Sequence, residues 1–281
     1  MKKNMPLLLA CALLIAASGI CNAQAKYEVI IESENSAPGY SVYRPANLKE
    51  AAADNLLPVL VFGNGGCARV SAGYRPLLST IASNGYIVFA IGTAEETEEQ
   101  QYHSDHQGED FMVDAIDWIC RESAKPESIY YHIVDTDNVA LAGHSCGGAQ
   151  AMRASYDPRV STTIMLNSGM GNMTMAGASA ANIEELHASI LYLIGGPEDV
   201  AYPNANLDFE KITNVPVVCA NIPVGHGGTY GEPEGGVLGK AMLQWMNWTM
   251  KGIREDSRFF SDSEWRKANS PEWDFKYKFV K

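Results

Sequence analysis

A serine, an aspartate and a histidine each follow a separate apolar segment of this chain, and together they could perform nucleophilic catalysis. They are Ser145, Asp199 and His226, which lie just beyond the apolar runs 139–142, 190–194 and 215–220. A serine hydroxyl is a weak nucleophile until an imidazole accepts its proton, and a carboxylate orients that imidazole and stabilises its cation. The chain order serine, aspartate, histidine is that of one known class of catalytic triad.

The segment around Ser145 predicts how the hydroxyl is presented. Residues 143–148 read Gly-His-Ser-Cys-Gly-Gly, after an apolar run and before a helix pattern of small residues. A G-x-S-x-G between a strand and a helix is typical of a nucleophile elbow, in which glycines allow a tight turn that exposes the serine. The side chain of His144 should point away from Ser145 at this turn, which favours a structural role.

Each residue taken alone has a simpler interpretation. An aspartate after a strand often caps a helix or forms a turn, and a histidine between glycines is often a loop residue. The combination favours catalysis, with Asp199 preferred to Glu198 as the acid. His103, Asp105 and His106 could suggest a metal site, but their acidic loop favours a solvated segment. We expect no metal and no cofactor.

Acyl transfer also needs two backbone N–H groups that stabilise the developing oxyanion. One is expected from Cys146, directly after the nucleophile. The second is expected from the glycine-rich turn at residues 63–68, which follows the apolar run 57–62. An ordinary glycine turn is the alternative, but the turn comes at the end of a strand that would lead to the site.

Apolar runs alternate with helical patterns along the chain. Strands are predicted at residues 40–45, 57–62, 86–91, 139–142, 162–166, 190–194 and 215–220. Helices are predicted at residues 74–83, 108–122 and 238–250, and a further helix follows the 143–148 motif and ends at Ser155. Because Pro45 ends the first strand, that strand should be peripheral. The alternation predicts an α/β fold: a doubly wound, mostly parallel sheet with helices on both faces and its chemistry at the carboxyl ends of the strands.

The chain begins with two lysines and an apolar stretch that ends in Ala-Gln-Ala, which predicts a signal peptide over residues 1–25, cleaved near Ala25. Lipidation at Cys21 is the alternative. Residues 26–281 are expected to form a single domain, exported to the periplasm or beyond. Four cysteines remain, for which three full pairings exist.

Acidic residues dominate the exported chain. The whole chain has 21 lysines and arginines against 33 acids; residues 1–25 hold two lysines and no acid, so 19 basic residues remain and the net charge is −14. This balance opposes binding to nucleic acid, which needs a basic face. We expect no membrane span and no nucleic-acid partner, and the composition leaves the oligomeric state open.

The assembled motifs resemble the α/β-hydrolases over residues 38–252, nearest to dienelactone hydrolases, cutinase-like polyester hydrolases and platelet-activating-factor acetylhydrolases. The resemblance rests on segments 59–67, 81–86, 143–148, 195–199 and 225–227. Dienelactone hydrolases use a cysteine nucleophile. Here the flanking glycines lie two residues from Ser145 on either side, so Ser145 rather than Cys146 occupies the apex.

Alignment with the polyester hydrolases implies a role for Cys67. It stands where their aromatic oxyanion-hole residue stands, so its N–H would be the second oxyanion donor. Cys146 occupies the other position that flanks the acyl group. The resemblance therefore suggests a disulfide between Cys67 and Cys146, and the missing aromatic residue argues against an aromatic polyester substrate.

The resulting expectation is a secreted serine esterase that acts on a small or polymeric carboxylic ester through an acyl-enzyme. Gly66, Met170 and Tyr230 are expected to bind substrate. A serine peptidase or amidase is the alternative enzyme, and a non-catalytic binding protein of the same fold is a further one. Acyl length and alcohol identity stay open.

Overall fold

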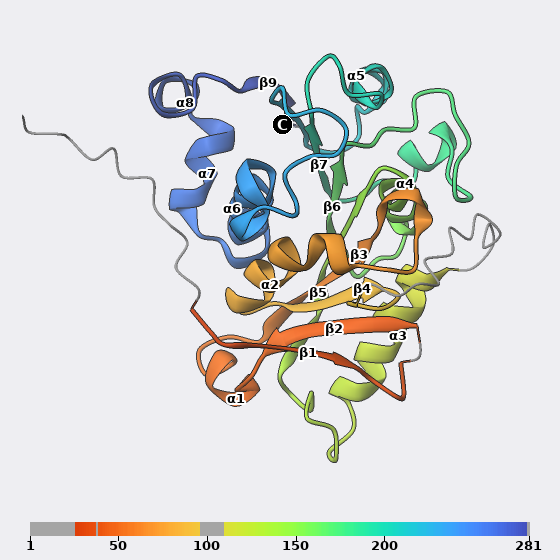
Figure 1. Ribbon diagram of the computed structural model, residues 1–281, viewed down its shortest axis with the longest axis vertical. Helices are drawn as coiled ribbons and strands as arrows, with labels where there is room; N and C mark the ends of the chain where they lie inside the picture. The colour runs from red at the N-terminus through yellow and green to blue at the C-terminus, as the bar shows by residue number, and fades with distance from the viewer. Residues whose placement is uncertain (1–25, 38, 96–109, 280–281) are drawn as a thin grey trace, which may run out of the picture.

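The computed structural model describes residues 26–37, 39–95 and 110–279, which form a nine-stranded sheet in the order β1-β2-β4-β3-β5-β6-β7-β8-β9 (Figure 1). The predicted signal peptide lies outside these residues, as do His103, Asp105 and His106. The six central strands are β3 (Leu57–Gly63), β4 (Ile87–Ile91), β5 (Val134–His144), β6 (Val160–Leu166), β7 (Ser189–Ile194) and β8 (Val217–Asn221). They pair in parallel. The predicted α/β class and mostly parallel sheet are confirmed.

The central strands are buried on both faces because helices cover each side. In β3, Leu60 and Phe62 pack into one apolar cluster, whereas Val59 and Val61 pack into another. The first cluster includes α2 (Arg75–Ser83) and α6 (Gly236–Lys251); opposite it lie α3 (Phe111–Ser123), α4 (Cys146–Ala154) and α5 (Tyr202–Lys211) (Figure 1). This two-sided burial explains the continuous apolar runs in the sequence.

Antiparallel strands flank the parallel ones. β2 (Tyr40–Pro45) pairs with β4, and β1 (Val29–Ser33) covers its other side and takes the edge position. Residues 40–45, expected to be peripheral, form the second strand from this edge of the sheet, and every residue of β2 is buried. β1 reads Val-Ile-Ile-Glu-Ser and was not among the predicted strands. The short helix α1 (Leu48–Ala51) follows β2.

The C-terminal residues extend the fold beyond the predicted elements. α7 (Arg254–Ser261) and α8 (Ser263–Asn269) lead to β9 (Asp274–Lys278), which pairs antiparallel with β8. Aromatic rings connect this extension to α6: the ring centroids of Phe260 and Trp245 lie 5.0 Å apart. Within the described ranges, no helix has both the length and the apolar character needed to cross a membrane.

Candidate active site at the carboxyl ends of the parallel strands

The backbone at Ser145 forms a strained turn between β5 and α4. Ser145 has φ 52° and ψ −116°, a conformation that residues other than glycine rarely adopt. A Cβ at Gly143 would collide with the backbone of Gly147, and one at Gly147 would collide with the carbonyl of Gly63. The turn is therefore possible only because glycines allow this close approach, as the nucleophile-elbow motif predicts.

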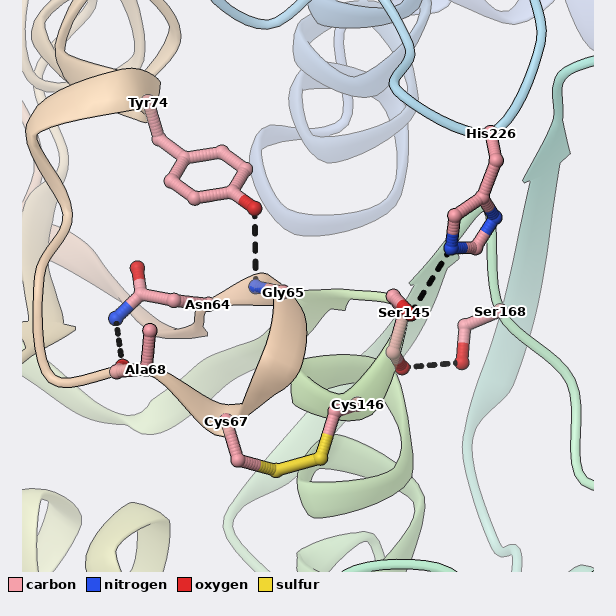
Figure 2. Close-up of a disulfide and its surroundings, with 9 residues drawn as sticks. All are labelled: Asn64, Gly65, Cys67, Ala68, Tyr74, Ser145, Cys146, Ser168 and His226. Atoms are coloured by element: carbon pink, nitrogen blue, oxygen red, sulfur yellow. Dashed lines mark hydrogen bonds between the residues drawn. A yellow bond between two sulfur atoms is a disulfide. The ribbon is translucent and has the colours of Figure 1, made fainter. Parts of the chain in front are cut away.

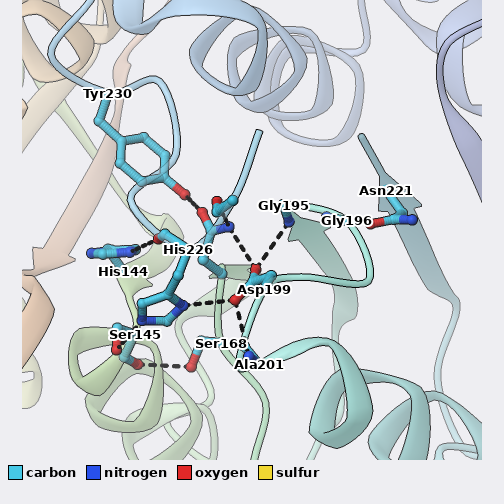
Figure 3. A network of polar contacts seen from close by, with 12 residues as sticks. His144, Ser145, Ser168, Gly195, Gly196, Asp199, Ala201, Asn221, His226 and Tyr230 are labelled. Carbon is cyan, nitrogen blue, oxygen red and sulfur yellow. Dashed lines mark hydrogen bonds and ion pairs between the residues drawn. The ribbon is translucent and has the colours of Figure 1, made fainter. Parts of the chain in front are cut away.

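The structure brings Ser145, His226 and Asp199 into one chain of hydrogen bonds (Figure 3). The Nε2 atom of His226 lies 3.0 Å from Ser145 Oγ, and its Nδ1 atom lies 2.7 Å from Asp199 Oδ1. An ionised carboxylate only accepts, so Nδ1 carries the proton and Nε2 can accept one from the serine hydroxyl. The arrangement can therefore remove a proton from Ser145 and return it to a leaving group.

Asp199 is held as a buried carboxylate at the end of β7. The backbone N–H groups of Gly195 and Ala201 donate to it, each at 2.9 Å. Burial raises the pKa of Asp199, but these donors, together with the side chains of Asn167 and His226, outweigh it and hold the pKa below its ordinary value. Glu198, the competing acid, is exposed to solvent.

Asn167 is a site residue that the sequence reasoning missed. It follows β6 with φ 44°, and its Nδ2 atom donates to Asp199 Oδ2 at 2.7 Å and to the carbonyl of Gly225 at 3.1 Å. Its own carbonyl oxygen accepts from the hydroxyl of Tyr230. One amide thus contacts both the acid and the loop that carries His226. Its position directly after an apolar strand was the available signal.

The two proposed oxyanion donors are covalently linked. A disulfide joins Cys67 to Cys146, with the Cα atoms 5.2 Å apart (Figure 2). Cys146 is the first residue of α4, so its N–H has no acceptor within the helix. Cys67 ends the short 3₁₀ turn Gly65–Cys67 after β3, with φ 51°. The loop that follows β3 is therefore fixed to the first turn of α4.

Asn64 fixes the start of the same loop. It is buried, and its amide Nδ2 donates to the carbonyl of Ala68 at 2.8 Å and to that of Ile91 at 2.6 Å. The loop is thus attached at one end to β4 and at the other to α4. Such attachment limits the movement of backbone donors, as a preorganised anion site requires.

The three residues expected to bind substrate lie in different environments. Gly66 is exposed on the loop beside Cys67, with φ 65°. Met170 is fully buried, and its N–H donates to the buried Asp208, whereas Tyr230 is 3% exposed and donates to Asn167. Their contact with substrate stays a prediction, and Gly66 alone presents substantial surface.

No group of three or more potential metal-ligating side chains is clustered within the part of the chain that the structure describes. A scan of the sequence against protein-family models found no match, and a search of curated proteins found no relative. The functional assignment therefore depends on the geometry of Ser145, His226 and Asp199.

Proposed function

We propose that this protein is an exported serine hydrolase that cleaves carboxylic esters through an acyl-enzyme. One observation carries the proposal: Ser145, His226 and Asp199 are linked by hydrogen bonds of 3.0 and 2.7 Å at the carboxyl ends of three parallel strands. Supporting it, the serine lies on a strained strand-to-helix turn, where α/β-hydrolases place their nucleophile.

In the proposed reaction, Ser145 Oγ attacks the ester carbonyl carbon while its proton moves to His226 Nε2. The carbonyl oxygen becomes an oxyanion that accepts hydrogen bonds from the N–H groups of Cys146 and Cys67. The C–O bond to the alcohol then breaks, and the alcohol leaves with the proton from His226. Asp199 stays ionised and stabilises the imidazolium.

Hydrolysis of the acyl-enzyme repeats these steps with water. His226 takes a proton from the water as its oxygen attacks the acyl carbon, and returns the proton to Ser145 Oγ as the ester bond to the enzyme breaks. The carboxylic acid leaves and the free serine is restored. The cycle requires no oxidant, reductant or metal.

The wider assignment extends the same proposal to the fold and the compartment. The sheet and its helices on both faces support a doubly wound α/β-hydrolase fold, of the branch that holds dienelactone hydrolases, cutinase-like polyester hydrolases and platelet-activating-factor acetylhydrolases. A disulfide between Cys67 and Cys146 is compatible with an oxidising compartment, which supports export.

A panel of nitrophenyl esters of graded acyl length, with an acetylated glycan and an aminoacyl anilide, tests the proposal. The wild type should hydrolyse at least one ester, and Ser145→Ala should abolish that turnover. Ser155→Ala, at the opposite end of α4, is the matched control, because it removes a buried serine hydroxyl that bonds only within its own helix turn. Ester turnover by Ser145→Ala at the wild-type rate, or activity on the anilide alone, would overturn the proposal.

A further inference from the structure

His144 connects two loops of the site without bonding to the nucleophile's hydroxyl. It is buried, and both ring nitrogens have partners. Nδ1 lies 2.8 Å from the hydroxyl oxygen of Tyr74. Nε2 lies 2.7 Å from the backbone carbonyl oxygen of His226, a contact that Figure 3 shows. The sequence predicted only that this ring would point away from Ser145. The structure gives it two specific contacts.

The direction of each hydrogen bond follows from chemistry. A carbonyl oxygen can only accept, so the proton of a neutral His144 must lie on Nε2. Nδ1 is then an acceptor, and the hydroxyl of Tyr74 donates to it. Burial lowers the pKa of His144, which favours this neutral form.

The hydrogen-bond chain continues to the loop at residues 63–68, called the oxyanion loop because it carries the proposed donor Cys67. The hydroxyl oxygen of Tyr74 accepts from the backbone N–H of Gly65 at 2.9 Å (Figure 2). A Cβ at Gly65 would lie 2.5 Å from His144 Nδ1 and 2.8 Å from the Tyr74 hydroxyl oxygen, so the backbone lies directly against both partners. The ring of Tyr74 also packs on Phe62, with centroids 5.0 Å apart.

We propose that Tyr74 and His144 are positioning residues that hold the oxyanion loop and the His226 loop in a fixed relative placement. The proposal depends on the ester hydrolysis proposed above. The transition state needs the oxyanion donors and His226 Nε2 in place at the same moment, and small misplacements reduce rate steeply. The disulfide fixes the oxyanion loop to α4, whereas this chain of hydrogen bonds fixes it to the catalytic histidine.

Tyr74→Phe is the primary test, because it removes one hydroxyl and keeps the ring. We expect kcat for the best ester to fall about 10- to 100-fold, because a buried hydrogen bond is lost, with KM within about threefold of the wild-type value. Tyr86→Phe is the control, because it removes a buried tyrosine hydroxyl that bonds Asn247 at the opposite end of the sheet. It should leave kcat unchanged.

Two variants of His144 each retain one of its two hydrogen bonds. His144→Gln can still donate toward the carbonyl of His226, and His144→Asn can still accept from Tyr74. Both should lower kcat, and combining either with Tyr74→Phe should cost less than the product of the single effects, because the residues act as a unit.

The close approach of Gly65 gives an independent variant. Gly65→Ala should separate Tyr74 from His144 and lower kcat, whereas Gly73→Ala, where an added Cβ meets no atom within 4 Å, should not. Thermal unfolding of each variant identifies any loss caused by misfolding.

The outcomes separate the two proposals. A wild type that turns over no ester and reacts with no fluorophosphonate would refute the proposed function itself. The positioning role would be refuted if the wild type is active and Tyr74→Phe has an unchanged kcat. It would be refuted equally if Tyr74→Phe lowers the melting temperature and leaves kcat unchanged. If the effects of Tyr74→Phe and His144→Gln on kcat are fully multiplicative, the claim that Tyr74 and His144 act as a unit is also contradicted.

Discussion

The disulfide between Cys67 and Cys146 joins the residue that ends the turn after β3 to the residue that follows Ser145 in the chain. These residues carry the two N–H groups proposed to stabilise the oxyanion. They are 79 residues apart in sequence, and their Cα atoms lie 5.2 Å apart. The covalent link therefore serves both the stability of the fold and the geometry of the proposed oxyanion site.

Removing the disulfide should lower both stability and activity. For Cys67→Ala/Cys146→Ala we expect a loss of about 2–4 kcal/mol in the free energy of unfolding, since the bond closes a long loop. Ester turnover should also fall, because the donor loop loses an anchor. Urea denaturation and kcat measure the two effects.

Chemical reduction provides the matched comparison. A phosphine reductant should lower the activity of the wild type and should leave the double alanine variant unaffected. It should also lower the activity of Cys120→Ser, because Cys120 is a free cysteine outside the disulfide. Full activity of the wild type after mass spectrometry shows both thiols reduced would contradict this prediction.

Asn167 should influence the rate although it touches neither Ser145 nor the imidazole of His226 by hydrogen bond. Asn167→Ala removes a donor to the carboxylate of Asp199 and to the carbonyl of Gly225. Loss of a hydrogen bond to a charged group costs about 1.5–3 kcal/mol, so kcat should fall about 10- to 100-fold. Asn138→Ala, which removes an amide bonded to the carbonyl of Met250 far along β5, is the control. Equal kcat values for Asn167→Ala and Asn138→Ala would refute the proposed influence of Asn167 on the rate.

Acid should weaken the fold partly through Asp199. Its pKa is lowered in the folded protein, so its ionised form favours folding above the unfolded-state pKa of about 3.9, and this contribution disappears as pH falls through the folded value. The difference in unfolding free energy between wild type and Asp199→Asn should therefore be larger at pH 5 than at pH 3. Urea denaturation at both pH values measures it. A difference that grows on acidification would contradict the lowered pKa.

The sequence predicted the parts of the site that follow apolar strands. Ser145, Asp199 and His226 each follow a run whose burial on both faces identifies it as a central strand, so their approach at one edge of the sheet could be expected. Asn167 occupies an equivalent position after β6. It was missed because a single amide carries no recognisable motif.

Other elements could not be read from local pattern. The helix α5 was not predicted, although Pro203 lies in its first turn, where the missing N–H of proline costs nothing. The elements α7, α8 and β9 were not among the predicted elements, and their aromatic contacts with distant residues such as Trp245 could not be read from the local sequence. The partners of His144 likewise come from segments 70 and 82 residues away.

Covalent labelling with a fluorophosphonate tests the central claim most directly. The account predicts that peptide mapping of the wild type finds the phosphonyl adduct on Ser145, and that His226→Gln reacts at least about 100-fold more slowly, because the imidazole no longer accepts the serine proton. Ester turnover by a protein whose Ser145 stays unmodified, or labelling of Ser145 at an equal rate in His226→Gln, would contradict it.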